Sequence, residues 1–277
     1  MKPTKSKFSV FKQICELIPG HLVSNLAKKH EVDKKSRTYS PWSHVITLIY
    51  AQISHSLSLN DVCDALKHHA SKLSTVRGAT PPSRNGLSHA NKVRNADMAQ
   101  ALFWEMLEHL QSLHPKFGYT HQYGKLPRRF KRLIHIVDST TIQLVSNCMS
   151  WAKHRRRKAA AKCHLRLNLQ TFLPKFAVVQ EAKPHDATQA KVLCADIQAG
   201  EIVVFDKAYL DFDHLYELDQ RGIFWVTRAK TKLSYVPVTS GITLKKGIVQ
   251  DRIIKLYPTC SKLNYPKTLR LVTAEVE

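Results

Sequence analysis

The sequence predicts a helical N-terminal region followed by a mixed α/β or α+β core. Apolar residues recur at helical spacing up to about residue 115, whereas short apolar runs alternate with helical stretches from about residue 119. Beyond residue 230 the pattern is strand-like and polar. With 277 residues, of which 43% are hydrophobic, the chain is long enough to bury a substantial core. We expect four segments, at residues 1–76, 77–118, 119–230 and 231–277.

The helices of the first region have clear start signals. Ser40 is expected to cap a helix that has Pro41 at its first position, because proline suits the first helical turn. Ser58 and Asp61 have the spacing of a loose capping box, which predicts a helix over residues 58–73. A long apolar stripe predicts a further helix that closes the second segment.

One helix of the second segment is unusually polar. It is expected to begin at Ser83, because serine is a preferred N-cap. Its inward-facing positions are Leu87, Ala90 and either Val93 or Arg94. Its outward-facing positions are Arg84, Asn85, Ser88, His89, Asn91 and Lys92. Such side chains contact phosphates and base edges in DNA complexes, and the preceding helix completes a helix-turn-helix pattern. A solvated polar helix face explains the pattern equally well.

The core segment is expected to contain strands that alternate with helices. The strands are placed at Leu133–Val137, Cys163–Gln170, Phe176–Val179, Ile202–Phe205 and Ile223–Val226, and the helices at Lys191–Ile197 and Phe212–Arg221. Asp138 directly follows the first strand, and Asp206 directly follows the fourth. We therefore expect each of these carboxylates to be held rigidly where a strand gives way to a loop.

The chain is strongly basic, with 43 Lys plus Arg against 21 Asp plus Glu and a net charge of +22. This excess favours a polyanionic partner, either a nucleic acid or an anionic membrane surface. No apolar run approaches the ~20 residues of a membrane span, which excludes an integral membrane protein, and the N-terminus lacks the apolar stretch of a secretory signal. Residues 125–166 carry twelve cations against one acid, Asp138.

The six cysteines lack the C-x-x-C spacing of common zinc sites. We expect them to be buried, reduced thiols in a cytosolic protein. A zinc site made from Cys148, His154, Cys163 and His164 is disfavoured because the spacing of these residues is irregular.

Two carboxylates on neighbouring strands would form a site for a hard divalent cation. Like charges a few Å apart repel by roughly 4 kcal/mol at an effective dielectric constant of ~20, and Mg²⁺ or Mn²⁺ between them removes that cost. Surrounding cations would hold a phosphodiester against the metal, as in two-metal phosphoryl-transfer sites. The residues therefore indicate metal-dependent phosphodiester chemistry on DNA or RNA. The alternative interpretation makes Asp138 a structural counter-ion within a basic stretch.

Three segments resemble the catalytic segments of bacterial insertion-sequence transposases of the insertion sequence 4 family. They are His135-Ile-Val-Asp138-Ser-Thr-Thr-Ile142, Lys162-Cys-His-Leu-Arg-Leu-Asn-Leu-Gln170 and Glu201-Ile-Val-Val-Phe-Asp206-Lys-Ala-Tyr209. The opening helices, with Ser40-Pro-Trp-Ser-His44, resemble the N-terminal domain that often precedes this catalytic core. The resemblance implies a helical N-terminal domain, a DNA-binding helical segment, an RNase H-like mixed-sheet core and the start of a β-rich insertion.

The resemblance also implies an activity, a cofactor and partners. Asp138 and Asp206 would be the first two metal ligands of an Asp-Asp-Glu triad that uses Mg²⁺ (or Mn²⁺). The enzyme would nick double-stranded DNA at transposon ends and join the freed 3′-hydroxyl to target DNA. It would act as a homodimer in the bacterial cytoplasm, associated with the nucleoid. Lys207 would line the same cleft and touch phosphate, whereas Tyr209 is expected to pack in the interior.

The basic and polar residues expected to contact DNA come from both halves of the chain. They are Arg84, Asn85, His89, Lys92, Arg94, Arg128, Arg129, Arg132, Arg155, Arg156, Arg157, Lys158 and Lys207. Contacts of this number predict an affinity that falls steeply as the salt concentration rises.

The third acid of the family pattern is missing. It lies in a helix with the pattern Tyr-x2-Arg-x3-Glu-x6-Lys, which Glu217, Glu275 and Glu277 do not match. We therefore expect the front portion of a transposase, truncated before the catalytic Glu, with an apolar sheet face exposed; it would bind DNA but transpose poorly. The alternatives are a non-catalytic remnant that occupies transposon ends or inhibits the intact enzyme, and a basic RNA-binding or ribosome-associated protein. The chain lacks the aromatic-rich sheet of common RNA modules, which disfavours the last.

Overall fold

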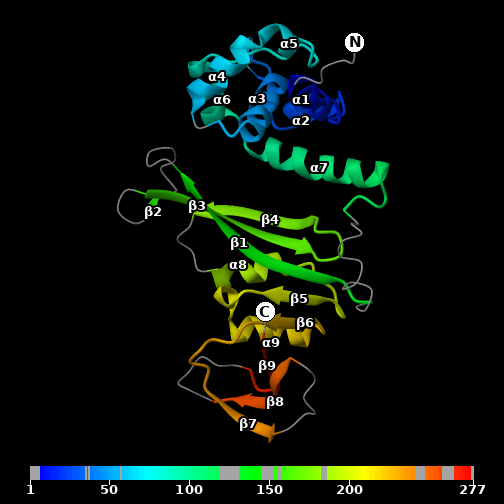
Figure 1. Cartoon of the computed structure of the whole chain (residues 1–277), viewed down its shortest axis with the longest axis vertical. Helices are drawn as coiled ribbons and strands as arrows, with labels where there is room; N and C mark the ends of the chain where they lie inside the picture. The colour runs from blue at the N-terminus through cyan, green and yellow to red at the C-terminus, as the bar shows by residue number, and fades with distance from the viewer. Residues whose placement is uncertain are drawn as a thin grey trace. The chain divides into compact units, whose positions relative to one another are not determined.

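The computed structural model describes residues 7–34, 36, 38–56, 58–118, 131–144, 153–154, 158–181, 186–240, 247–257 and 265–275. The chain divides into two compact units, Met1–Phe117 and Gly118–Glu277, and each is described here by itself (Figure 1). No helix among the described residues is long and apolar enough to cross a membrane.

The first unit is helical. Its helices are α1 (Lys7–Glu16), α2 (Leu22–Lys29), α3 (Pro41–Ile53), α4 (Leu59–His68), α5 (Ala70–Ser74), α6 (Arg84–Val93) and α7 (Asp97–Leu113). The Ser40 hydroxyl accepts the Ser43 backbone N–H at the start of α3, with Pro41 at the first helical position. Ser58 and Asp61 form both bonds of a capping box at the start of α4. These two sequence predictions are confirmed, because capping depends only on residues within one turn.

The predicted helix over residues 58–73 is wrong as a single element. It is interrupted at His69, whose backbone (φ −102°, ψ 22°) leaves the helical region and separates α4 from α5. The His69 ring packs 5.7 Å from the ring of Phe8 in α1. This break therefore accompanies packing against α1, a helix far away in the sequence. The helical periodicity of residues 58–73 contains no information about that contact.

Helix α6 has the two-sided character that the sequence predicts. Leu87 and Ala90 are buried, and Leu87 joins a core cluster with Phe11 of α1 and Ile46 of α3. Of the two candidates for the next inward position, Val93 is 58% exposed, and Arg94 turns inward instead. The Arg94 guanidinium donates to the backbone carbonyl oxygens of Tyr39 and Ser40 and lies 5.2 Å from the centroid of the Tyr39 ring.

The second unit contains two sheets and two α-helices among its described residues. Its elements are β1 (Ile134–Leu144), β2 (Lys153–His154), β3 (Lys158–Asn168), β4 (Pro174–Glu181), α8 (Asp186–Leu193), β5 (Ile202–Phe205), the 3₁₀ turn η3 (Lys207–Tyr209), α9 (Phe212–Gln220), β6 (Phe224–Thr227), β7 (Tyr235–Ser240), β8 (Ile248–Leu256) and β9 (Leu269–Ala274). The larger sheet has the order β2-β3-β1-β5-β6, with β4 paired to β3. Strands β1, β5 and β6 are parallel, and the pairs β1–β3, β2–β3 and β3–β4 are antiparallel. The predicted mixed α/β class is confirmed.

Strand β1 is longer than the sequence predicts. It does not end at Val137 but continues through Asp138 to Leu144, so the expectation that Asp138 lies where strand gives way to loop is wrong. The extension is held by antiparallel pairing with β3, which continues from His135 opposite Asn168 to Leu144 opposite Ala159. The apolar runs of the sequence miss this extension because the residues after Asp138 are polar. The β-branched threonines among them favour a strand without adding apolar character. Strand β5 ends at Phe205, as predicted, and Asp206 follows it.

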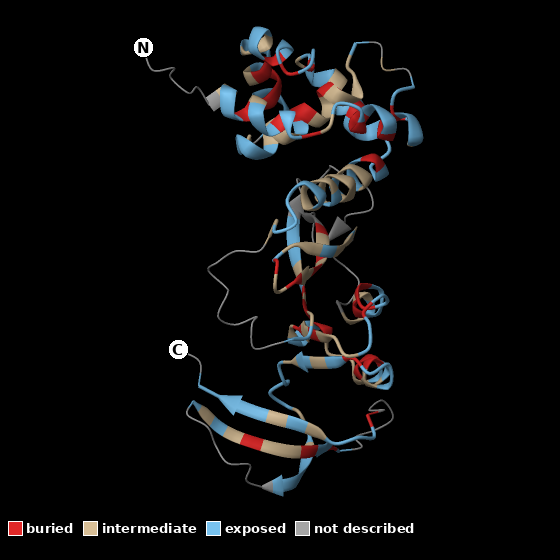
Figure 2. Ribbon diagram, turned by 90° about the vertical axis from the view of Figure 1, so that its right-hand side faces the viewer, coloured by how far each residue is buried: buried red, intermediate tan, exposed pale blue. Residues whose placement is uncertain are grey.

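One face of the larger sheet carries the core of the second unit. Val137, Val203 and Phe205 pack there with Leu193 of α8 and Leu218 of α9. In Figure 2 both helices lie on one side of the strands and carry buried residues. Buried His214 of α9 also belongs to this face, and its ring lies 6.2 Å from that of Phe205.

The opposite face of the sheet is apolar and exposed in the described part of the chain. Phe224 and Val226 of β6 are 52% and 55% exposed, and Val179 of β4 is also exposed. Strand pairing puts Phe224 and Val226 opposite Ile202 and Val204 of β5, so these residues share one face. The exposed apolar face expected from the sequence is therefore present.

The smaller sheet, β7-β8-β9, is antiparallel and confirms the strand-like pattern beyond residue 230. Ile254 and Leu256 of β8 reach into the same core cluster as α9. Buried Asp251 of β8 pairs with Arg270 of β9, whose Nε lies 2.9 Å from Asp251 Oδ1. This hydrogen-bonded pair holds the pKa of Asp251 below its usual value.

Buried His214 makes the stability of the second unit depend on pH. Burial lowers its pKa, and the nearest carboxylate oxygen, from Glu217, is 3.6 Å from Nδ1. Because the pKa is lower in the folded chain, the unfolded chain binds the proton more tightly. The free energy of unfolding therefore decreases as the pH falls below about 6.5, by up to about 1.4 kcal/mol per pH unit. We expect the melting temperature to fall between pH 7.5 and 5.5, and to fall less in His214→Leu. An unchanged pH dependence in that variant, measured by calorimetry, would assign the effect to other groups.

Candidate catalytic pair and DNA-binding surface

Asp138 of β1 and Asp206, the residue directly after β5, occupy neighbouring backbone positions at the end of a parallel strand pair. Val137 of β1 is paired with Phe205 of β5, and each aspartate is the next residue along its strand or just beyond it. Val137 and Phe205 point into the core, so alternation along an extended chain directs the next side chains to the other, uncovered face. The backbone of Asp206 is still extended (φ −72°, ψ 157°), which carries this alternation one residue past β5. Paired strands are ~4.8 Å apart, so the backbone positions of the two aspartates are neighbours.

The carboxylates keep oxygen lone pairs for a ligand. Asp138 is exposed, and its Oδ1 accepts the backbone N–H of Ser139 at 2.7 Å. Asp206 is half-buried, and its side chain accepts no capping bond from the turn that follows. An ionised carboxylate has about four acceptor sites, so one backbone bond leaves Asp138 able to bind a cation.

The donor chemistry of this pair suits a hard divalent cation. Mg²⁺ and Mn²⁺ prefer carboxylate oxygens, and both aspartates present them on one face. Within the ranges that the structure describes, no group of three or more His, Cys, Asp or Glu residues is placed to hold a metal ion. Cys148 of the disfavoured zinc combination lies outside the described residues, as does the side chain of His154.

Lys207 is the cation nearest to this pair in sequence. It is exposed and begins the 3₁₀ turn η3 directly after Asp206. A lysine at this position can balance the charge of a bound phosphodiester. Tyr209, at the end of the same turn, is 1% exposed and packs in the core, as predicted.

The sequence did not predict a contact between buried His135 and half-buried Glu201. His135 of β1 lies 3.1 Å, through Nε2, from Oε2 of Glu201, and this carboxylate oxygen also accepts the Gln198 backbone N–H. Burial lowers the pKa of His135, against the opposing effect of the Glu201 hydrogen bond. Both residues stand in the motif segments, but nothing in the spacing of two positions 66 residues apart indicates that they meet.

The described cations of the basic stretch 125–166 do not all lie at the surface. Arg166 is 2% exposed and forms a two-pronged ion pair with Asp196, at 2.5 and 2.7 Å, so counting it as a surface cation is wrong. Arg132 donates to the carbonyl oxygen of Gly200 and lies 4.3 Å from the centroid of the Phe224 ring. The following predicted DNA contacts lie outside the described residues: Arg128, Arg129, Arg155, Arg156, Arg157 and the side chain of Lys158.

In the helical unit, α6 presents the predicted polar surface. Its exposed members are Arg84, Asn85, Ser88, His89, Asn91 and Lys92. Asn91 Oδ1 lies 2.7 Å from Nε2 of His44 in α3, which fixes the orientation of that amide. Arg94 differs from the other predicted DNA contacts, because its guanidinium is engaged by Tyr39 and Ser40. A pocket of about 670 Å³ is lined by residues of α6 and of the segment before α3, among them Lys34, Tyr39 and His89.

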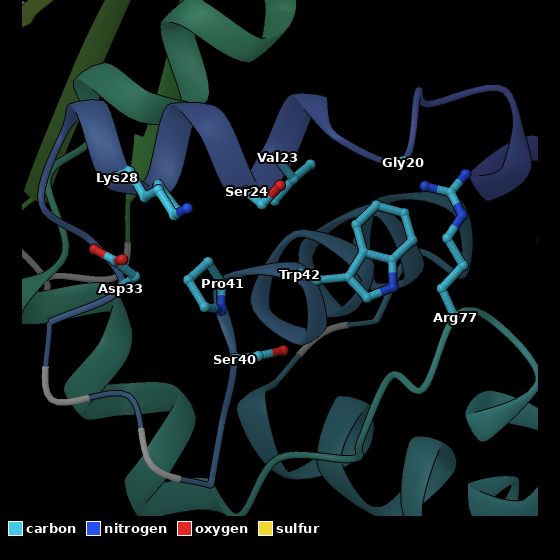
Figure 3. Close-up of a pocket in the computed structure, with 10 residues that line it drawn as sticks. Gly20, Val23, Ser24, Lys28, Asp33, Ser40, Pro41, Trp42 and Arg77 are labelled. Atoms are coloured by element: carbon cyan, nitrogen blue, oxygen red, sulfur yellow. The ribbon is translucent and has the colours of Figure 1, made fainter.

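A separate cavity of about 340 Å³ lies between α2 and the start of α3 (Figure 3). Arg77 lies 4.7 Å from the centroid of the Trp42 ring at one end and donates to the carbonyl oxygen of Ile18 at 2.5 Å. The Trp42 indole N–H donates to the Val76 carbonyl oxygen at 2.9 Å. These contacts tie α1, α3 and the segment after α5 together, so Trp42 and Arg77 are explained by packing.

Comparisons with known proteins agree on one class. Residues 129–258, which include both aspartates, match the family described as Transposase DDE domain, and residues 6–76 match Domain of unknown function (DUF4372). The chain is 25% identical over 249 residues to the transposase for insertion sequence element IS231E of Bacillus thuringiensis subsp. finitimus, covering 87% of this chain and 48% of that one. It is 27% identical over 105 residues to the probable transposase for insertion sequence element IS5377 of Geobacillus stearothermophilus, covering 38% of this chain and 27% of that one.

A solved structure, the cryo-EM structure of the piggyBac transposase synaptic complex with hairpin DNA, matches with a TM-score of 0.40 and 10% identity. The match covers 96% of this chain and 59% of that one, and the likeness is too weak to define the fold.

By family resemblance, residues 129–258 are similar to the DDE domain of transposases, which supports an enzyme of the nuclease and strand-transferase type. Its curated relatives are transposases of insertion sequence elements, which supports an insertion-sequence transposase. The chain spans about half the length, or less, of these relatives.

Proposed function

We propose that this chain carries the catalytic aspartates of an insertion-sequence transposase that cleaves and joins double-stranded DNA. The observation that carries the proposal is the parallel pairing of β1 with β5, which sets Asp138 beside Asp206 on an uncovered face. The match of residues 129–258 to the Transposase DDE domain supports the same residues. Assignment to the insertion sequence 4 family, with an RNase H-like core, rests on the motif segments around these aspartates and on the mixed sheet.

Asp138 and Asp206 would hold Mg²⁺ or Mn²⁺ through their carboxylate oxygens. When bound there, such an ion supplies Lewis-acid activation of the attacking water or 3′-hydroxyl. The Asp138 carboxylate is oriented by the Ser139 N–H, whereas only the backbone of Asp206 is held by the turn that follows it, through the Tyr209 N–H that donates to its carbonyl oxygen. Lys207 would bind a phosphate oxygen of the same strand, since its side chain is exposed next to Asp206.

The test of this function is a DNA cleavage assay on the full chain. The substrate is a duplex that carries the DNA flanking the gene, and the reaction is run with Mg²⁺, Mn²⁺ or EDTA. We expect nicks that require the metal and map to fixed positions at an element end. Binding of the duplex without any cleavage would favour the non-catalytic remnant that occupies transposon ends.

Helix α6 is proposed as the element that reads DNA in the helical unit. Its exposed face carries Arg84, Asn85, His89 and Lys92 and no acid, and an α-helix fits the major groove. The contact between α4 and α6 supports a helix-turn-helix arrangement. Arg94 would act indirectly, by holding Tyr39 against the end of α6.

The paired substitution Arg84→Ala with Lys92→Ala tests this surface. We expect the affinity for duplex DNA to fall and the slope of log K against log salt to become shallower by about 2, because each lost cation removes about one phosphate contact. Lys72→Ala is the matched control, since Lys72 is an exposed lysine on α5 in the same unit. Equal effects of the pair and the control, in binding titrations at several salt concentrations, would remove α6 from the DNA interface.

A homodimer on paired ends and association with the bacterial nucleoid are further proposals that rest only on the resemblance to insertion-sequence transposases. The segment boundaries 1–76, 77–118, 119–230 and 231–277 are kept as a proposal, although α6 shares a core cluster with α1, α3 and α4. Sedimentation of the chain with and without DNA that carries the element ends measures whether the homodimer forms.

A further inference from the structure

A buried hydrogen bond joins β3 to the turn that follows β5, across the strand that carries Asp138. In the larger sheet β1 lies between β3 and β5 (Figure 1). Tyr209, three residues after Asp206, has its hydroxyl 2.8 Å from Nδ1 of His164 on β3. Tyr209 is 1% exposed and His164 is fully buried. The bond therefore connects β3 to the turn after β5 on the core side of the sheet, beneath the aspartates.

The direction of this bond follows from the partner on the other side of the ring. The amide nitrogen Nε2 of Gln180 on β4 lies 3.0 Å from Nε2 of His164. An amide NH₂ group only donates, so His164 Nε2 accepts and the ring proton sits on Nδ1. His164 is then neutral and donates to the Tyr209 hydroxyl oxygen. Three elements, β4, β3 and η3, are linked by this buried chain.

The same chain fixes the backbone next to Asp206. The Tyr209 backbone N–H donates to the carbonyl oxygen of Asp206 at 3.0 Å, and Leu210 donates to Lys207 at 3.2 Å. Anchoring the Tyr209 ring therefore anchors the peptide of Asp206. On the other side, His164 is paired in register with Ser139, the residue after Asp138. One hydrogen bond thus relates the position of Asp206 to that of Asp138.

We propose that Tyr209 and His164 are positioning residues that hold Asp206 at the separation from Asp138 at which both carboxylates bind one divalent cation. The inference rests on the proposed metal site of the transposase and adds two residues to it. Neither side chain would touch the ion, because both lie on the core face. Their effect is transmitted through the 3₁₀ turn.

The test is the affinity of the full chain for Mn²⁺, measured by electron paramagnetic resonance of the free ion. Groups that support a metal ligand typically contribute 10–100-fold to affinity, so we expect Tyr209→Phe to weaken Mn²⁺ binding by about 10-fold or more. Tyr265→Phe is the matched control, because Tyr265 is a buried tyrosine of the same core cluster. It is expected to change Mn²⁺ affinity by less than about 2-fold. The melting temperatures of both variants are measured as well, because a loss of Mn²⁺ affinity without a matching drop in melting temperature reflects the metal site and not the fold.

Histidine variants sharpen the test. His164→Gln keeps an amide that can donate to Tyr209 and is expected to retain more Mn²⁺ affinity than His164→Leu. The inference is overturned if Tyr209→Phe binds Mn²⁺ like the parent chain, or if its loss of affinity is matched by Tyr265→Phe at the same drop in melting temperature. Asp206→Asn reports on the proposed function separately. If that variant binds Mn²⁺ as the parent does, the metal site itself is wrong and the inference fails with it.

Discussion

Replacing Asp138 or Asp206 by asparagine is expected to abolish metal-dependent DNA cleavage. Each substitution removes one of the two anionic ligands that the pairing of β1 with β5 brings together. Loss of a group that only supports a metal ligand typically lowers metal affinity or activity by roughly 10–100-fold. Loss of a ligand itself should therefore reduce the cleavage rate by more than about 100-fold. Gel analysis of end-labelled duplex in Mg²⁺ measures the rate.

The asparagine variants keep the shape of the side chain, so folding and DNA binding should persist. We expect the melting temperature and duplex affinity of both to remain close to those of the parent chain. Asp213→Asn is the control, since Asp213 is an exposed aspartate at the start of α9. Cleavage at the parent rate by Asp138→Asn would exclude this residue from the catalytic pair.

Arg166→Ala is expected to lower the free energy of unfolding by about 3 kcal/mol or more. The substitution removes a buried side chain that binds both oxygens of Asp196 and the carbonyl oxygen of Leu193. Breaking a buried ion pair costs about 3–5 kcal/mol, and the Asp196 carboxylate is largely exposed, which keeps the expected cost near the lower end. Urea unfolding monitored by fluorescence gives the free energy.

Two further variants distinguish the charge of Arg166 from its volume. Arg166→Met fills most of the space without a charge, and replacement of a buried ion pair by apolar groups is often close to neutral, so we expect much of the stability to return. Lys191→Ala breaks the exposed ion pair with Glu217 and should cost less than about 1 kcal/mol. If Arg166→Ala lowers the free energy of unfolding no more than Lys191→Ala does, the Arg166–Asp196 pair stabilises the fold no more than an exposed ion pair.

The elements that the sequence predicted well are those specified within a few residues. Ser40 with Pro41, and Ser58 with Asp61, mark helix starts through bonds inside one turn. The strand Ile202–Phe205 is a short apolar run with clear ends, and it was predicted with its exact bounds. The candidate aspartates were found in the same way, because each follows an apolar run.

The structural features that the sequence missed depend on partners far away in the chain. The extension of β1 through Asp138 is held by β3, and the break at His69 accompanies packing on Phe8. Arg166 is buried and pairs with Asp196, which lies 30 residues away in the chain. From the sequence alone, Arg166 was therefore counted among the cations of the basic stretch. Apolar periodicity reports which side of an element is buried, but not which partner covers it.

By itself, the sequence determined the division into helical and mixed parts, the basic character and the polar face of α6, and it singled out the two candidate aspartates. Only the tertiary structure decided that the backbones of these aspartates are neighbours, that Tyr209 and His164 join β3 to the turn after β5, and that the described residues leave one apolar sheet face exposed. The reason is physical: helix caps and strand propensity act within a few residues, whereas strand order and register are set by contacts between segments separated by tens of residues.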